Sequence, residues 1–250
     1  MIPIRFQVED ETVRGTLHLP EPIEQPVPAV MIIPGFADTA VGPHNLHVQM
    51  AQAIVKQGFA VLRFDYRGQG ESDGDFSRFT IKSGLEDARE GLAYLRRQQQ
   101  VDANRLGIVG FSLGAMLAVQ LASERNEVKA LSLLGPVAYP EKVFTAFFEP
   151  HHFKEARDRG WIDWLGWPVG KGFLDSLRDL DPLQAMDTVD AKIIVFHGSK
   201  DTEVPTENGA AFANKGADMN WMEGADHPFS SVLQKKAIIS RSCEWFLAYL

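Results

Sequence analysis

The stretch Leu106-Gly-Ile-Val-Gly-Phe-Ser-Leu-Gly-Ala-Met-Leu-Ala118 decides the fold. It begins with an apolar run typical of a buried strand and ends with an apolar helical run. Between them, Gly110, Ser112 and Gly114 form a G-x-S-x-G pattern, whose glycines leave room for a sharp turn from strand to helix. Such a turn presents the Ser112 hydroxyl at the edge of a sheet. The stretch therefore predicts a strand–turn–helix unit with Ser112 as a candidate nucleophile.

Similar apolar runs recur along the chain and indicate the fold class. Continuously apolar runs, as in strands buried on both faces of a parallel sheet, cover residues 29–33, 60–64, 106–110, 130–134 and 192–196. Period-two patterns over residues 4–8 and 12–19 predict an opening hairpin. Apolar positions at helical spacing over residues 46–54, 81–95 and 239–250 predict helices. The alternation predicts an α/β fold with a mostly parallel central sheet and helices on both faces.

One segment interrupts this alternation. Residues 136–181 separate two strand candidates by 46 residues, which is too long for an ordinary connection. About a fifth of the segment is aromatic, twice the chain-wide share of 10%, which is too rich for a solvated loop. We expect a helical cap or lid over residues 136–181, inserted into a core domain of residues 1–135 and 182–250. The nine aromatic residues are Tyr139, Phe144, Phe147, Phe148, Phe153, Trp161, Trp164, Trp167 and Phe173.

Composition excludes several classes of protein. The 250 residues carry a net charge of −8, which argues against nucleic acid as a partner because phosphate binding needs a basic face. The single cysteine, Cys243, cannot form an internal disulfide and has the pattern of a packed core residue. The chain shows neither a signal-peptide pattern at its N-terminus nor an apolar run long enough to span a membrane. We expect a cytoplasmic protein with no membrane partner, and a homodimer stays open as an oligomeric state.

A serine hydroxyl becomes a strong nucleophile only with a base and an orienting acid. Asp201 follows the strand candidate at 192–196, at the end where catalytic groups collect in open α/β sheets, and Glu203 is the rival acid. His227 lies in a loop before the last helix and is the candidate base, whereas His197, at a strand end, is interpreted as structural. The chain order Ser112, Asp201, His227 is the order of the triad in α/β hydrolases.

The developing negative charge in acyl transfer needs two backbone N–H donors. One should be Leu113, which follows the serine. The other should be Phe36 in the loop Pro34-Gly35-Phe36, which follows the strand candidate at 29–33. No histidine–carboxylate cluster at metal-ligand spacing stands out, so we expect neither a metal nor an organic cofactor.

From about residue 33 to residue 229 the chain resembles the α/β-hydrolase superfamily. The stretch Phe64-Asp-Tyr-Arg-Gly-Gln-Gly-Glu-Ser-Asp-Gly74 is similar to the D-x-R-G-x-G-x-S loop of the lipase-, esterase- and aminopeptidase-like branch; we interpret it as a structural turn. The hairpin opening, compact cap and D-x-x-V-P sequence around Asp201 are most similar to cinnamoyl/feruloyl esterases and small carboxylesterases. Pro34 stands where these families usually have histidine, and Leu113 where Gln or Met is frequent.

The resemblance implies a serine carboxylesterase that acts on short-chain acyl or hydroxycinnamoyl esters. Aromatic residues of the insert should shape its apolar pocket, and Phe144, Phe148, Trp161 and Trp164 are the candidates. A peptidase that binds an N-terminal amine would need carboxylates in its cap, and Glu149 and Glu155 are available there. A thioesterase and a non-catalytic binding protein on the same fold remain alternatives.

Overall fold

The computed structural model describes all 250 residues and contains one eight-stranded sheet, in the order β1-β2-β4-β3-β5-β6-β9-β10. Strands β4 to β10 of this order run parallel to one another, and the β1–β2 hairpin joins β4 antiparallel. The strands are β1 (Ile2–Val8), β2 (Glu11–His18), β3 (Val27–Ile33), β4 (Ala60–Phe64), β5 (Val101–Phe111), β6 (Val128–Leu134), β9 (Lys192–Gly198) and β10 (Asp218–Met222). The expected α/β fold with a mostly parallel sheet and an opening hairpin is confirmed.

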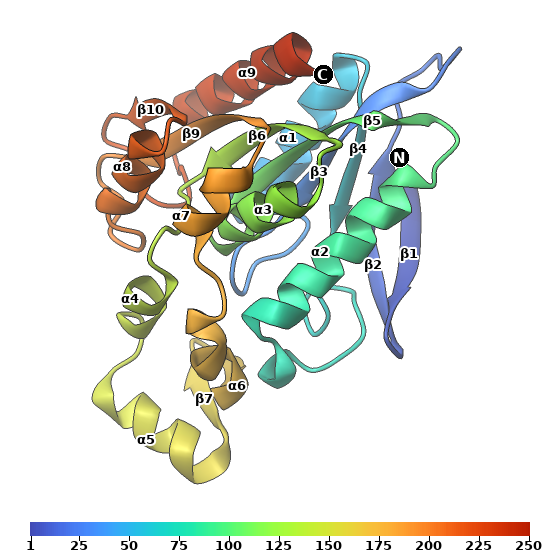
Figure 1. Cartoon of the computed structure of the whole chain (residues 1–250). Helices are drawn as coiled ribbons and strands as arrows, with labels where there is room; N and C mark the ends of the chain where they lie inside the picture. Colours follow the sequence, from blue (N-terminus) through green and yellow to red (C-terminus); the bar gives the residue numbers. More distant parts are fainter.

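Helices cover both faces of the sheet (Figure 1). On one face α2 (Ile81–Arg96) and α3 (Leu113–Glu124) form a core with alternate residues of β3, namely Ala29, Met31 and Ile33. On the other face α1 (Leu46–Lys56) and α9 (Val232–Tyr249) pack against Val30 and Ile32. Because successive side chains of a strand point to opposite faces, a strand covered on both sides reads as continuously apolar. No helix has both the length and the apolar character needed to cross a membrane.

Sequence patterns missed the edge strand β10. Its residues Asp-Met-Asn-Trp-Met are partly exposed, and it pairs in parallel with β9 alone. An edge strand buries less of each face and can therefore contain polar residues. For this reason β10 does not form a continuous apolar run in the sequence. Two short helices flank β9 in the sequence: α7 (Pro182–Ala185) precedes it and α8 (Glu207–Asn214) follows it.

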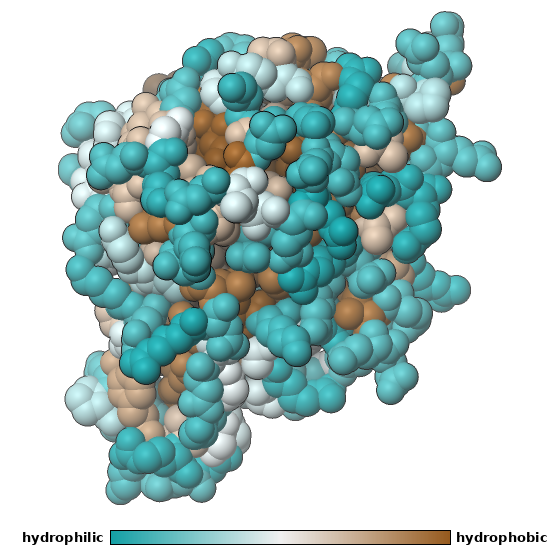
Figure 2. All heavy atoms as spheres, in the orientation of Figure 1, coloured by the Kyte–Doolittle hydropathy of each residue, from teal (hydrophilic) through white to brown (hydrophobic).

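The aromatic insert extends away from the sheet, below α7 in Figure 1. It contains α4 (Pro140–Thr145), α5 (Pro150–Arg159), the antiparallel hairpin β7 (Trp161–Trp164) and β8 (Trp167–Gly170), and α6 (Lys171–Asp175). The sequence analysis did not predict the hairpin within it. Hydrophobic residues gather on the surface where the insert joins the body, and its far end is hydrophilic (Figure 2).

The strand register brings the functional loops to one edge. Ile33 of β3 pairs with Gly110 of β5, Phe111 with Leu134 of β6, and Leu134 with Phe196 of β9. Four strands therefore end at the same level, and the loops that follow them start side by side. This is the carboxyl edge at which ligands bind in open α/β sheets.

Candidate active site

Ser112 lies in a strained turn between β5 and α3. Its φ is 53° and its ψ is −117°, a conformation that is unusual for a residue with a side chain. A Cβ at Gly110 would lie 2.5 Å from Ala115 Cα, and one at Gly114 would lie 2.3 Å from the Ile33 carbonyl oxygen. Only glycine fits both positions, so the G-x-S-x-G pattern has a direct steric cause.

Asp201 and His227 form a buried hydrogen-bonded pair. The Asp201 Oδ2 atom accepts a hydrogen bond from His227 Nδ1 at 2.7 Å, and Oδ1 accepts from the backbone N–H groups of Glu203 and Val204 at 3.0 and 2.8 Å. The loop of Asp201 and the loop of His227 are joined by a backbone hydrogen bond, which Lys200 N–H donates to the Ala225 carbonyl. The rival acid Glu203 is exposed and contributes only its backbone.

The proton on the His227 ring follows from this pairing. An ionised carboxylate only accepts hydrogen bonds, so Nδ1 is the donor and Nε2 of the neutral ring keeps a free lone pair. No hydrogen bond joins Ser112 Oγ to the ring, and neither Ser112 Oγ nor His227 Nε2 is among the fully buried unpaired atoms. Both reactive atoms therefore retain contact with solvent.

Two neighbours hold the His227 ring in place. Its centroid lies 5.0 Å from that of Phe111, the residue before Ser112. Gly135, just after β6, has a positive φ of 54°, and a Cβ there would lie 2.9 Å from His227 Cε1. The ring is thus held between the Ser112 turn and the end of β6.

The loop after β3 passes beside Ser112. A Cβ at Gly35 would lie 3.3 Å from Ser112 Cβ, and the Tyr66 hydroxyl anchors the loop by donating to the Pro34 carbonyl at 2.9 Å. The backbone N–H groups of Phe36 and Leu113 have no hydrogen-bond partner. The two N–H groups expected to stabilise an oxyanion are thus free on either side of the serine.

Three of the four aromatic candidates in the insert belong to one cluster around Phe36. The rings of Phe144 and Trp164 each lie 5.5 Å from that of Phe36, and Phe148 contacts Trp164 at 6.2 Å. Trp161 lies outside the cluster, with the Arg159 guanidinium 3.7 Å from its ring. We use the name aromatic cluster for Phe36, Phe76, Phe79, Phe144, Phe147, Phe148, Trp164, Trp167 and Phe173.

The side-chain role of Phe36 and the contributions of Phe76 and Phe79 are not evident from the sequence. Phe36 was assigned a backbone role only, and the other two precede α2, outside the insert. Phe36 lies in the loop after β3, whereas Phe76 and Phe79 lie together in the short turn before α2, so the three residues show no periodic pattern. Only the folded chain shows that these loops and the insert meet.

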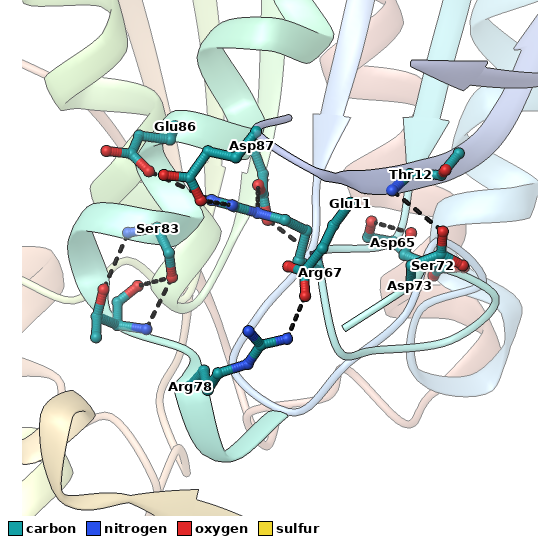
Figure 3. A network of polar contacts seen from close by, with 12 residues as sticks. Glu11, Thr12, Asp65, Arg67, Ser72, Asp73, Arg78, Ser83, Glu86 and Asp87 are labelled. Carbon is teal, nitrogen blue, oxygen red and sulfur yellow. Dashed lines mark hydrogen bonds and ion pairs between the residues drawn. The ribbon is translucent and has the colours of Figure 1, made fainter. Parts of the chain in front are cut away.

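The stretch 64–74 is a structural turn, as interpreted from the sequence. Asp65 accepts hydrogen bonds from the N–H groups of Ala40 and Glu71, and Arg67 donates to the buried Asp87 of α2 through Nε at 2.6 Å. Arg67 lies between Glu86 and Asp87 of α2 and the opening hairpin (Figure 3). The stretch therefore ties the hairpin to α2.

Other polar groups give no sign of a metal centre. No group of three or more His, Cys, Asp or Glu side chains could hold a metal ion. Five surface cavities of about 260 to 480 Å³ lie elsewhere, and none is lined by the Ser112, Asp201 or His227 side chains. The aromatic cluster packs beside the Ser112 turn through Phe36, whose neighbour Gly35 adjoins Ser112.

Known proteins resemble the chain in sequence and in fold. Esterase EstD of Thermotoga maritima is 31% identical over 145 residues, which is 55% of this chain and 34% of that protein. The mitochondrial palmitoyl-protein thioesterase ABHD10 of Pongo abelii is 26% identical, over 75% of this chain and 61% of that one. The structure of Est1E from Butyrivibrio proteoclasticus with ferulic acid has a TM-score of 0.84 at 22% identity, and covers 98% of this chain and 99% of that one.

The extent of these matches differs. Alignments with the first curated relatives span between 34% and 54% of their length, whereas the similarity to Est1E covers both chains almost completely and shows the fold. The model of the prolyl oligopeptidase family matches residues 44–250, a range that includes Ser112, Asp201 and His227. The chain therefore belongs to the prolyl oligopeptidase family, has the α/β-hydrolase fold and has an esterase among its relatives.

Proposed function

We propose that the chain is a serine carboxylesterase that hydrolyses short-chain acyl or hydroxycinnamoyl esters through an acyl-enzyme on Ser112. The observation that carries this proposal is the 2.7 Å bond between His227 Nδ1 and Asp201 Oδ2, which leaves Nε2 free as a base. Two unpaired backbone N–H groups flank the same serine. Base and oxyanion donors are the two elements that acyl transfer from an ester requires.

In the first half-reaction, Ser112 Oγ attacks the ester carbonyl while His227 Nε2 removes its proton. Asp201 holds the ring in the correct tautomer and stabilises the imidazolium without taking the proton. The Phe36 and Leu113 N–H groups donate to the carbonyl oxygen as it becomes negative. Loss of one such donor typically costs about 3 kcal/mol of transition-state stabilisation.

The imidazolium then protonates the departing alkoxide, and the alcohol leaves. Water enters the position of the alcohol, His227 removes its proton, and attack on the acyl carbon passes through a second oxyanion. Collapse of this intermediate returns the proton to Ser112 Oγ and releases the acid. No step requires a metal or an organic cofactor.

The aromatic cluster supports an aryl or short acyl group as the substrate's acid portion. Phe144 and Trp164 pack with Phe36, and Phe148 packs with Trp164. Because the N–H of Phe36 is the proposed oxyanion donor, this aromatic surface adjoins the reacting carbonyl. Est1E, which shares the fold, binds ferulic acid in its structure. We propose that the insert at 136–181 acts as a cap whose aromatic side chains move to admit such a group.

The test is hydrolysis of p-nitrophenyl acetate and butyrate by wild type and Ser112→Ala, with fluorophosphonate labelling in parallel. Ser123→Ala, at the far end of α3, is the matched control. Activity and label should be lost together in Ser112→Ala and kept in the control. A folded wild type that neither turns over nor labels would overturn the proposal. Methyl ferulate compared with laurate esters then tests the substrate class, and a clear laurate preference contradicts it.

A peptidase is the second candidate, because the family model that matches the chain is that of a peptidase family. The two carboxylates of the insert that could bind a substrate amine already have partners on the surface of α5. Glu155 pairs with Arg159 at 2.9 Å, and Glu149 lies 3.4 Å from His151. Equal kcat/KM values on alanine or proline arylamides and on esters would favour the peptidase, and a preference for thioesters would favour a thioesterase.

A further inference from the structure

His197, the penultimate residue of β9, lies fully buried beside Asp201. Its Nε2 atom is 2.9 Å from the Val204 carbonyl oxygen and 3.4 Å from Asp201 Oδ2. Both of these oxygens only accept hydrogen bonds, so Nε2 carries the ring proton. Nδ1 is buried and has no partner, as expected of an unprotonated nitrogen. Burial lowers the pKa of His197, so the ring is neutral.

We infer that His197 is a positioning residue for the proposed reaction. Its Nε2–H donates to the Val204 carbonyl and lies 3.4 Å from Asp201 Oδ2, where its dipole stabilises the Asp201 carboxylate and weakens the interaction of that carboxylate with His227. The inference rests on the proposed function. Asp201 Oδ2 is the atom that also accepts the proton of His227 Nδ1. The N–H dipole of His197 partly offsets the negative charge of this oxygen, which weakens the hydrogen bond that His227 donates to it. Val204, whose carbonyl accepts from His197, donates its own N–H to Asp201 Oδ1, so the contact also restrains the carboxylate.

The surroundings isolate this contact from other charges. The charged or titratable groups that act on His197 are Asp201 and His227. From α8, Gly209 packs against the ring so tightly that a Cβ there would lie 2.6 Å from Nδ1, and from β10 the ring of Trp221 lies 5.9 Å away. Neither residue carries a charge. An effect of His197 on the pH dependence therefore involves Asp201 and His227 alone.

Removal of the His197 N–H should shift the pH dependence of the reaction in one direction. Without the nearby His197 N–H dipole, the Asp201 carboxylate interacts more strongly with His227 and favours its protonated form. Since catalysis needs His227 neutral, the acidic limb of the kcat/KM profile should move to higher pH, by about half a pH unit. The plateau of kcat/KM should fall a few-fold because Asp201 loses a restraint.

The experiment compares the pH profiles of p-nitrophenyl acetate hydrolysis by wild type, His197→Leu and His197→Gln. Leucine removes the donor, whereas the glutamine amide can place an N–H close to the position of Nε2. We expect the upward shift in His197→Leu and its reversal in His197→Gln. Equal loss at every pH with an unmoved limb, or the same shift in both variants, overturns the inference.

A measurement on the unmodified chain keeps the inference testable if His197→Leu fails to fold. In ¹⁵N NMR of histidine-labelled protein, His197 should show the neutral Nε2–H tautomer from about pH 5 to pH 9. A ring that titrates in this range, or that is protonated on Nδ1, overturns the inference. A wild type without esterase activity instead contradicts the proposed function, and the NMR result still decides where the His197 proton lies.

Discussion

Phe36 of the loop after β3 stacks on Phe173 of the insert, with ring centroids 4.3 Å apart and planes 17° apart. The backbone of Phe36 supplies one of the proposed oxyanion donors, and its side chain meets the insert. One residue therefore connects the segment at 136–181 to the position at which charge develops. Packing of the insert and geometry of the oxyanion site are coupled through this ring.

Phe173→Ala should reduce both stability and turnover. Phe173 is almost fully buried, and truncation of such a ring to alanine costs about 3 to 5 kcal/mol of unfolding free energy. Without the stacked partner Phe36 shifts, so kcat on p-nitrophenyl acetate should fall about tenfold, the effect of about 1.4 kcal/mol in the barrier. Urea unfolding and steady-state kinetics measure the two effects.

Phe153→Ala is the control for this variant, because Phe153 contacts Phe148 and makes no ring contact with Phe36. It should lower stability and leave kcat close to that of wild type. The coupling between insert and oxyanion site is refuted if the two variants lose kcat to the same extent.

Asp201→Asn should abolish most of the activity without unfolding the chain. Two backbone N–H groups donate to Oδ1, so the amide oxygen of asparagine takes this position and its NH₂ group faces His227. Nδ1 must then accept, and the ring proton moves to Nε2, toward the serine. The expected loss of kcat is about 10³- to 10⁴-fold, as for a wrong histidine tautomer in other serine hydrolases.

Asp226→Asn, one residue before His227, is the matched control for the charge change. Asp226 caps its own loop by accepting from Ser230 and does not contact the ring. Its kcat should stay within about twofold of wild type, since surface changes of this kind have small effects. An Asp201→Asn enzyme with comparable activity would remove Asp201 from the mechanism.

His18 should make the fold sensitive to acid. Arg63 Nε donates to His18 Nε2 at 3.1 Å, so this nitrogen cannot hold a proton in the native chain, and burial lowers the pKa of His18 from 6.5 to about 4. Between these values the unfolded chain binds a proton that the native chain does not. Stability is therefore complete above about pH 6.5 and falls as the pH drops toward 4.

Urea unfolding of wild type and His18→Gln at pH 7 and at about pH 4.5 measures this effect. The glutamine oxygen can accept from Arg63 and does not titrate, so the variant should lose less stability in acid than wild type. His151→Gln, which replaces an exposed histidine, should keep the wild-type dependence on pH. Parallel pH dependence of wild type and His18→Gln would show that another group is responsible.

The local sequence determined the central part of the fold and the candidate nucleophile. The run before Ser112 predicts a strand covered on both faces, and the glycines at 110 and 114 are required by contacts of the turn with its own helix and with β3. Asp201 and His227 are predicted from their loops, one after a strand and the other before the last helix, together with the chain order of the three residues. These features were readable because periodicity and turn geometry depend on neighbours in the chain.

Tertiary structure decided the contacts between distant segments. Phe36 and Phe173 are 137 residues apart in sequence, and nothing in either stretch indicates that their rings stack. His197 is interpreted as structural from its place at a strand end, because its distance to Asp201, which depends on how the loop after β9 folds back, cannot be read from the sequence. The exposed strand β10 carries too little apolar patterning to be recognised before its pairing with β9 is known. Such contacts depend on how whole helices, strands and loops pack against one another. The pattern of apolar and polar residues along the sequence does not specify that packing.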